Sequence, residues 1–315
     1  MSAIDHAATT GRRRVAVVGL GSIGGVIAGA LDATGRHDVT ACVRHGIARL
    51  MVERPDRTIE ARPRMLTDPA QADIHDWVLL CTKAQDTASS APWLQRLCGD
   101  GTHVAVLQNG IGHTERLAPF VGAATIVPTI VYYNGERLAP DRVRYRRASD
   151  HDFAVSDDAG GRAFVELLEG TGMQILVSPD FKTMAWRKLL LNAIANPITA
   201  LTLQRQGVFR REDMGPLVLA ALEEAAAVAR ADGARLADDE ASKLRAMLMT
   251  FPPDAGTSMY FDRLAGRRSE VDALTGAVVA AGERHQIATP LCRVLLTLMR
   301  AADAAPIPGL TEKAK

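Results

Sequence analysis

The chain has 315 residues, enough for two domains that each bury a core of their own. Hydrophobic residues make up 47% and charged residues 23%, which is typical of globular proteins rather than of disordered or membrane-embedded ones. The formal net charge of +1 gives no indication of nucleic acid or of an anionic membrane as a partner.

Further patterns exclude other classes of protein. Residues 1–11 are polar and lack the apolar core of a signal peptide, so we expect a disordered tail there. No apolar run reaches the roughly 18 residues that a membrane span needs. Histidines and cysteines show no metal-binding spacing, so no metal site is predicted. The four cysteines are widely spaced, which favours reduced thiols and a cytoplasmic location.

The first predicted element is a valine-rich strand at residues 14–18, and an apolar helix follows at residues 26–31. A G-x-G-x-x-G motif lies between them, the context that this dinucleotide-binding motif requires. Its glycines permit a tight turn, close approach of a pyrophosphate and close helix–strand packing, and the helix N-terminus offers free N–H groups to phosphates. An ordinary glycine-rich turn is the alternative. The predicted cofactor-binding loop is Gly19, Leu20, Gly21, Ser22, Ile23 and Gly24.

The second predicted strand, residues 38–44, ends in Arg44, about 20 residues past the last glycine of the motif. Sites for NAD usually carry Asp or Glu here, where the carboxylate binds the ribose 2′-hydroxyl. A guanidinium instead suits a 2′-phosphate through paired, charge-assisted hydrogen bonds. The sequence therefore favours NADP(H) as the cofactor, with a solvated arginine at a strand end as the alternative.

Two further apolar runs, residues 77–81 and 103–107, predict buried parallel strands that end in polar residues. Lys83 and Asn109 follow these strands, and ligands of open parallel sheets lie outside the carboxyl ends of strands. Both residues are therefore candidates for cofactor or substrate contact, although either could cap a helix or turn. Strands at 125–133, 143–145, 152–155 and 174–177 and a helix at 159–170 complete this part of the chain.

Helical periodicity dominates from Pro179 onward. The expected helices span residues 180–203, 213–232, 237–250, 257–284 and 289–303. The sequence thus predicts an α/β fold, with an N-terminal Rossmann dinucleotide-binding domain at residues 1–179. An all-helical C-terminal domain for substrate binding and catalysis is expected at residues 180–315.

A polar stripe runs along the first of these helices. Lys188, Asn192 and Asn196 are spaced four residues apart, so they share one helix face among apolar neighbours. Such groups are costly to bury without partners, and desolvation of a lysine lowers its pKa and suits it to proton transfer. A helix with one solvated edge is the alternative.

Ser258, Asp262 and Glu270 stand out in the predicted helix at residues 257–284. Ser258 and Asp262 are one turn apart, whereas Glu270 lies 12 residues from Ser258 and points about 120° away on a straight helix. The three share a site if the helix bends, for example at Gly266, or lies along a cleft floor. From spacing alone, a capping serine and a surface glutamate are the simpler interpretation.

Together these motifs resemble the ketopantoate reductase (2-dehydropantoate 2-reductase) family over about residues 14–300. The resemblance implies that Lys188 is the general acid and that Glu270 supports the lysine and the substrate. It implies substrate contacts for Asn109, Lys188, Asn192, Asn196 and Ser258. It implies cofactor contacts for the glycine loop, Arg44, Lys83 and Asn109. A lysine ammonium suits this reaction, because hydride arriving at a ketone carbon leaves negative charge on the oxygen.

The implied function is the NADPH-dependent reduction of ketopantoate to pantoate, in pantothenate and coenzyme A biosynthesis. The implied partner is a small 2-oxo acid, with neither nucleic acid nor membrane, and a homodimer is one alternative for the assembly. Departures from the family pattern at Gln206, Ala255 and Cys292 keep open a related reductase of another 2-oxo acid or ketone. An NADP-binding sensor is the non-enzyme alternative, and the presence of both Lys188 and Glu270 argues against it.

Overall fold

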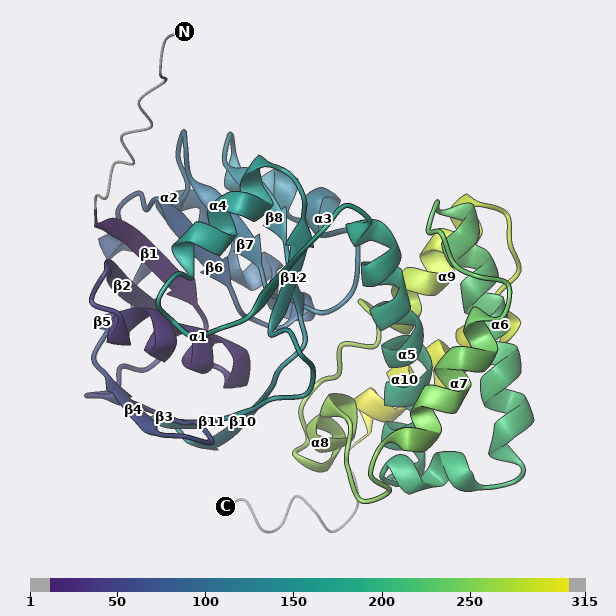
Figure 1. The fold of residues 1–315 in the computed structure, drawn as a ribbon. Coiled ribbons are helices and arrows are strands. Elements are labelled where there is room, and N and C mark those ends of the chain that lie inside the picture. The colour runs from purple at the N-terminus through teal and green to yellow at the C-terminus, as the bar shows by residue number, and fades with distance from the viewer. Residues whose placement is uncertain (1–11, 306–315) are drawn as a thin grey trace, which may run out of the picture. The chain divides into compact units, whose positions relative to one another are not determined.

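The computed structural model describes residues 12–305, so the tail expected at residues 1–11 lies outside the described part. The chain divides into two compact units, which are coloured from purple to teal and from teal to yellow in Figure 1. We call residues 12–82, 86–108 and 113–178 the sheet unit. We call residues 83–85, 109–112 and 179–305 the helical unit. Two short segments near the ends of sheet strands therefore group with the helices.

The sheet unit is built on a six-stranded, wholly parallel sheet in the order β5-β2-β1-β6-β7-β8. Its strands are β1 (Arg13–Val18), β2 (His37–Cys42), β5 (Arg64–Leu66), β6 (Trp77–Leu80), β7 (His103–Val106) and β8 (Thr125–Pro128). Counted within this sheet alone, the order is 3-2-1-4-5-6, which is that of dinucleotide-binding Rossmann folds. The predicted fold class of this part is confirmed.

Alternate residues of β1 enter two different cores. Val15 and Val17 pack with residues of α1 (Ser22–Ala33) and α4 (Ala159–Leu167). Ala16 and Val18 pack with residues of α2 (Ala91–Leu97) and α3 (His113–Val121). Because both faces of the sheet are covered, its strands are apolar throughout. Three short 3₁₀ turns join these elements: η1 (Pro69–Gln71), η2 (Ala84–Asp86) and η3 (Ala88–Ser90).

Two smaller sheets complete the sheet unit. One has the order β10-β11-β3-β4, from β10 (Asn134–Ala139), β11 (Arg142–Arg146), β3 (Leu50–Glu53) and β4 (Thr58–Ala61). The other has the order β13-β12-β9, from β13 (Ile175–Ser178), β12 (Phe153–Ser156) and β9 (Ile130–Val131). The single strand expected at residues 125–133 is wrong, because β8 pairs with β7 whereas β9 pairs with β12. The chain changes sheets at Thr129.

The helical unit contains six α-helices in its described part: α5 (Phe181–Thr202), α6 (Met214–Ala231), α7 (Glu240–Thr250), α8 (Ser258–Leu264), α9 (Thr275–Arg284) and α10 (Pro290–Ala304). A 3₁₀ turn, η4 (Gln206–Arg210), follows α5. The predicted helical character of this half is confirmed. No helix among residues 12–305 is long and apolar enough to cross a membrane.

The continuous helix expected at residues 257–284 is wrong. The chain leaves the helical conformation after Leu264, and Gly266 has a φ of 63°, in the left-handed region that ends many helices. Turns connect it to α9, which begins at Thr275. This break removes the straight-helix geometry that separates Glu270 from Ser258, and it places Glu270 in a connecting segment.

Helix α5 contains a proline and continues past it. Pro197 lacks the N–H that would bond to the carbonyl of Ala193, four residues earlier. The hydroxyl of Thr275, at the start of α9, donates to that carbonyl at 2.7 Å. The Asn196-Pro197 pair therefore creates a free acceptor inside the core, and a distant threonine satisfies it.

Candidate active site

The glycine loop follows β1 and has the conformation that its glycines were expected to permit. Gly19 has a φ of 94°, and its N–H donates to the carbonyl of Cys42 at 3.0 Å. A Cβ atom at Gly24 would lie 1.9 Å from the carbonyl oxygen of Gly19, so no other residue fits without movement. A Cβ at Gly21 would meet no atom within 4 Å. The loop is thus tight at its first and third glycines and open at its second.

Helix α1 begins at Ser22, directly after this open position. Its N-cap is Gly21, and no side chain caps the first turn. Free N–H groups and the positive end of the helix dipole therefore remain available at Gly21, where a phosphate group could approach the backbone. These features fit the pyrophosphate of a dinucleotide.

Arg44 lies two residues beyond the end of β2 and is exposed. Within residues 12–305 its guanidinium makes no hydrogen bond or ion pair. An arginine in this state keeps all of its donors for a ligand. It fits a role in binding a 2′-phosphate.

The carboxyl ends of β6 and β7 are tied together by polar side chains. The amide of Gln108 donates to the hydroxyl of Thr82 at 3.3 Å and to that of Thr87 at 3.1 Å. Lys83 and Asn109 are the residues that follow Thr82 and Gln108, and both group with the helical unit. The sequence predicted that Lys83 and Asn109 each follow the end of a parallel strand, and the structure shows that these strands, β6 and β7, are neighbours in the sheet.

Glu270 is 7% exposed and accepts hydrogen bonds from both of these short segments. Its Oε2 accepts from Nδ2 of Asn109 and its Oε1 from the backbone N–H of Ala84, each at 3.1 Å. Gly110 lies against the same connecting segment, since a Cβ there would be 2.4 Å from the carbonyl oxygen of Ala273. Glu270 is therefore a buried acceptor rather than the surface glutamate that its spacing alone favoured.

Lys188 lies half-buried on α5, and its Nζ is 3.3 Å from Oδ1 of Asn109. The Asn109 carboxamide thus connects the ammonium of Lys188 to the carboxylate of Glu270. Burial lowers the pKa of Lys188 to about 8, and the charge of Glu270 opposes this shift. The group remains largely protonated at neutral pH and can still release its proton.

The other polar residues of α5 lie further along the helix. Asn192 is half-buried, and Asn196 is only 5% exposed. The stripe therefore does not form the solvated edge that was its alternative interpretation. Ser258 is the first residue of α8 and is exposed. These three residues lie outside the hydrogen-bonded set of Lys188, Asn109 and Glu270.

Asp262 forms ion pairs with two cationic side chains. Its side chain is 5% exposed, and it forms ion pairs with Nζ of Lys83 and, at 3.0 Å, with Nε of Arg267. Sequence reasoning noted Asp262 but gave it no role, and it missed Thr275 and the backbone N–H of Ala84. Pro197 indicates that the carbonyl of Ala193 lacks its usual helical donor. The group that donates to it, the hydroxyl of Thr275, is 82 residues away, and no local pattern in the sequence predicts it.

The residues that depart from the family pattern lie in two places. Gln206 begins η4, and its N–H donates to the carbonyl of Ala255 at 2.9 Å, so these two positions are neighbours. Cys292 is fully buried in the core of the helical unit, and burial raises the pKa of its thiol. A substitution at Cys292 therefore acts through packing.

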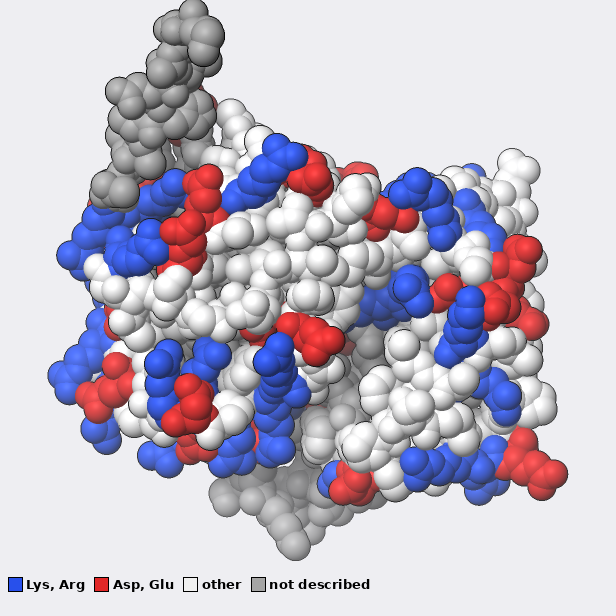
Figure 2. Space-filling model, in the orientation of Figure 1, with Lys and Arg blue, Asp and Glu red and all other residues white. Residues whose placement is uncertain are grey.

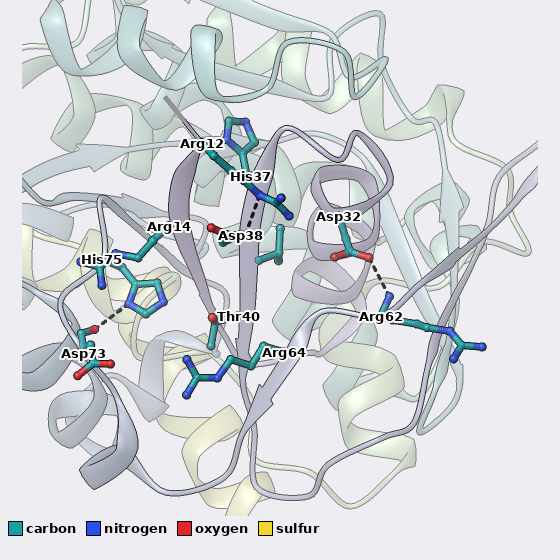
Figure 3. A pocket seen from close by; sticks show the side chains of 11 residues that line it. Arg12, Arg14, Asp32, His37, Asp38, Thr40, Arg62, Arg64, Asp73 and His75 are labelled. Carbon is teal, nitrogen blue, oxygen red and sulfur yellow. Dashed lines mark hydrogen bonds and ion pairs between the residues drawn. The ribbon is translucent and has the colours of Figure 1, made fainter. Parts of the chain in front are cut away.

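A separate pocket of about 380 Å³ lies in the sheet unit (Figure 3). It is lined near the amino ends of β1, β2 and β5, whereas the glycine loop follows the carboxyl end of β1. Two of its aspartates have partners in the lining: the Arg12 side chain pairs with Asp38 at 2.7 Å, and Asp32 accepts from the backbone N–H of Arg62 at 2.8 Å. None of the candidate site residues lines it.

Surface charge is mixed on the face of the molecule in Figure 2, where lysines and arginines lie among aspartates and glutamates. Exposed ion pairs are common in the described part of the chain, for example Arg36 with Glu169 and Arg162 with Asp157. No group of three or more metal-ligating side chains is found among residues 12–305.

The chain is similar to known proteins over almost its whole length. Residues 15–157 match the family described as Ketopantoate reductase PanE/ApbA, and residues 180–303 match Ketopantoate reductase PanE/ApbA C terminal. The chain is 39% identical over 291 residues to the 2-dehydropantoate 2-reductase of Caulobacter vibrioides, covering 91% of this chain and 98% of that protein.

Two further comparisons agree. The chain is 36% identical over 301 residues to the 2-dehydropantoate 2-reductase of Mycobacterium tuberculosis, covering 93% of this chain and 98% of that protein. The crystal structure of a PanE/ApbA family ketopantoate reductase from Ralstonia eutropha JMP134 superposes with a TM-score of 0.83 at 29% identity. That superposition covers 92% of this chain and 98% of the other.

Proposed function

The chain belongs to the ketopantoate reductase family and is an oxidoreductase of the kind that uses a nicotinamide cofactor, and we propose that it reduces 2-dehydropantoate to pantoate with NADPH. Such a product would serve pantothenate and coenzyme A biosynthesis. The observation that carries the proposal is the linked set of Lys188, Asn109 and Glu270, with the pKa of Lys188 lowered to about 8.

The proposed cofactor contacts are the loop from Gly19 to Gly24, Arg44, Lys83 and Asn109. Gly19, Leu20, Gly21, Ser22, Ile23 and Gly24 would hold the pyrophosphate, through the backbone at the open Gly21 and the uncapped start of α1. Arg44 would hold the 2′-phosphate through charge-assisted hydrogen bonds. When bound, the nicotinamide supplies the hydride for the reduction.

Lys188 is the proposed general acid. Its ammonium would stabilise the negative charge that develops on the substrate oxygen and donate a proton to it. Because the pKa of Lys188 is about 8, the donor form predominates at neutral pH. Its lowered pKa also makes proton release easier than from an ordinary lysine, whose pKa is near 10.4.

Asn109 and Glu270 orient that ammonium. A carboxamide accepts hydrogen bonds on its oxygen and donates them from its nitrogen. Its oxygen therefore turns toward the ammonium and its nitrogen toward the carboxylate. Oδ1 faces Lys188 and Nδ2 faces Glu270. We propose that Glu270 acts on Lys188 partly through this amide and partly by its charge, which raises the pKa of the lysine.

The substrate contacts proposed are Asn192, Asn196 and Ser258, with Asn109 and Lys188 at the reacting carbonyl. Amides and hydroxyls can bind carboxylate and hydroxyl groups without adding charge. We further propose the division of labour expected from the sequence, with residues 1–179 for the cofactor and residues 180–315 for substrate and catalysis. Lys83 and Asn109 belong to residues 1–179 in the sequence but group with the helical unit. We therefore propose that these two residues of the first part act together with the catalytic residues of the second.

A second candidate is the reduction of another 2-oxo acid or ketone. The neighbouring positions Gln206 and Ala255 favour it, because both depart from the family pattern. Ala255 lies three residues before Ser258, and Gln206 bonds to Ala255. The carbonyl oxygen of the Gln206 side chain is buried and has no hydrogen-bond partner among the described residues. A ligand group that donates a hydrogen bond would satisfy this oxygen.

A panel of 2-oxo acids tests both candidates, with the loss of NADPH absorbance as the measurement. Ketopantoate should give the highest kcat/KM, and analogues without its 4-hydroxyl should be poorer, since site groups left unpaired penalise them. Indifference to that hydroxyl would support the second candidate. No turnover of any 2-oxo acid by folded, NADPH-binding protein would contradict the proposed reduction of ketopantoate.

A further inference from the structure

Asp262 has a clear geometry and no role in the reaction as described so far. Its carboxylate is almost fully buried, and a buried charge is costly unless it is paired. Its two partners differ in setting: the side chain of Lys83 is 34% exposed and that of Arg267 is 58% exposed. The three groups carry a net charge of +1, so pairing with Asp262 does not cancel the positive charge of Lys83.

The position of Asp262 is fixed by the elements around it. Thr257, the N-cap of α8, accepts from the N–H of Tyr260 at 3.1 Å. The hydroxyl of Thr257 also bonds to that of Thr199 on α5, at 2.7 Å. Helix α8 is thereby anchored to the longest helix of the unit, and Asp262 lies on its second turn.

Lys83, by contrast, has a flexible four-carbon stem, and ordering such a side chain costs rotamer entropy. Its neighbours are held by the same part of the helical unit. Ala84 donates its N–H to Glu270, and Nε2 of Gln85 donates to the carbonyl of Arg268, each at 3.1 Å. With the ion pair to Asp262, three consecutive residues, 83–85, are fixed to the segment between Asp262 and Glu270.

We propose that Asp262 is a positioning residue for Lys83, holding its ammonium where the cofactor meets it. This rests on the proposed cofactor contact of Lys83. The ion pair with Asp262 fixes the place of the Lys83 ammonium without neutralising the cluster, which keeps a net charge of +1. Arg267 offsets the charge of Asp262, and the cluster remains attractive to the anionic cofactor.

A double-mutant cycle tests the proposal, with the dissociation constant of NADPH from fluorescence titration as the measurement. Asp262→Asn removes the carboxylate charge at nearly constant volume, and Lys83→Ala removes the ammonium. Each should weaken NADPH binding by about threefold to tenfold, the scale of one ordered side chain. The double variant should bind no more weakly than Lys83→Ala, because Asp262 acts through Lys83. The kcat at saturating cofactor should change less than KM.

Asp272→Asn is the matched control. Asp272 lies in the segment that connects α8 to α9, is more exposed than Asp262 and pairs with Arg300 at 2.7 Å and Arg268 at 3.5 Å. Its neutralisation should leave NADPH binding unchanged. Should Asp262→Asn fail to fold, Asp262→Glu keeps the charge and shifts it by one methylene. The effect of Asp262→Glu on NADPH binding should then vanish in the Lys83→Ala background.

Two outcomes would overturn the inference in distinguishable ways. If Lys83→Ala leaves NADPH binding unchanged, the proposed cofactor contact of Lys83 fails, and the role of Asp262 fails with it. If Lys83→Ala weakens binding but the Asp262 variants weaken it equally with or without Lys83, the cofactor contact stands and Asp262 has only a structural role.

Discussion

The two units assemble their candidate functional groups in opposite ways. In the sheet unit, six consecutive residues from Gly19 to Gly24 form the loop, and backbone geometry makes it suitable for a phosphate. In the helical unit, Asn109 meets Glu270 from 161 positions away and Lys188 from 79 positions away. A backbone site is sensitive to added volume, whereas a site of distant side chains is sensitive to lost charge.

The glycine loop illustrates the first kind. A Cβ at Gly24 would overlap the carbonyl of Gly19, while no charged side chain takes part in the loop. Lys188 and Glu270 illustrate the second kind, because the Asn109 carboxamide bonds to the charged group of each. Removal of the Lys188 charge should therefore leave cofactor binding by the glycine loop intact, and the following variants examine this separation.

The largest effect is expected for Lys188→Ala. It removes the proposed proton donor and the charge that stabilises the substrate oxygen, which typically costs on the order of 10² or more in rate. The kcat should fall at least about 100-fold, while the dissociation constant of NADPH stays close to that of the unaltered protein. Steady-state kinetics and fluorescence titration measure the two quantities. A folded variant with near-normal kcat would remove Lys188 from the mechanism.

Glu270→Gln should have the next largest effect, and it should also move the pH profile. Lys188 donates its proton only when protonated, so kcat should fall as pH rises through its pKa of about 8. The charge of Glu270 raises that pKa, so its removal lowers it and shifts the falling limb to lower pH. At pH 8 we expect about a tenfold lower kcat.

The pH profile of Lys188→Ala is the control for this shift. Its residual activity should lack the falling limb that belongs to Lys188. A limb that stays in place or moves to higher pH in Glu270→Gln would show that the two groups are not electrostatically coupled.

Arg44→Ala should have a smaller and more selective effect. Loss of charge-assisted hydrogen bonds to a phosphate should raise the KM for NADPH by about tenfold, given roughly 1.5 kcal/mol for one such bond. The KM for NADH should hardly change, because NADH has no 2′-phosphate. Kinetics with both cofactors measure the ratio. Equal changes for both would assign Arg44 to the protein surface instead.

Thr275→Val should affect stability and leave turnover nearly unchanged. The variant keeps the shape of the side chain but leaves the carbonyl of Ala193 without its donor, a loss of about 1–3 kcal/mol for a buried acceptor. Urea denaturation measures the free energy of unfolding. Thr275→Ser retains the hydroxyl and should recover most of the loss. Equal destabilisation by both variants would mean that the methyl group matters rather than the hydrogen bond.

Sequence patterns predicted the sheet unit well where function depends on contiguous residues. The glycine motif, the valine-rich β1 and the polar ends of β6 and β7 are local signals, and the structure places all of them as expected. The strand expected at residues 125–133 failed because an apolar run does not tell which sheet each half joins. Pairing of β9 with β12 depends on residues more than twenty positions away.

The helical unit was predictable in outline but not in its connections. Helical periodicity located α5, α6, α7 and α10 to within a few residues. It could not show that the chain turns after Leu264, since only the conformation of Gly266 and its surroundings decides this. The roles of Asp262 and Thr275 depend on partners 179 and 82 positions away, and no spacing rule reaches that far.

The carboxamide of Asn109 has a consequence for spectroscopy. It never titrates, yet its oxygen faces the ammonium of Lys188 and its nitrogen faces the carboxylate of Glu270. When Lys188 loses its proton, the donor to that oxygen is weakened, and the polarisation of the whole amide changes. The side-chain ¹⁵N–¹H₂ resonances of this single asparagine therefore report, from within the site, the protonation state of a lysine whose own ammonium protons exchange rapidly with water.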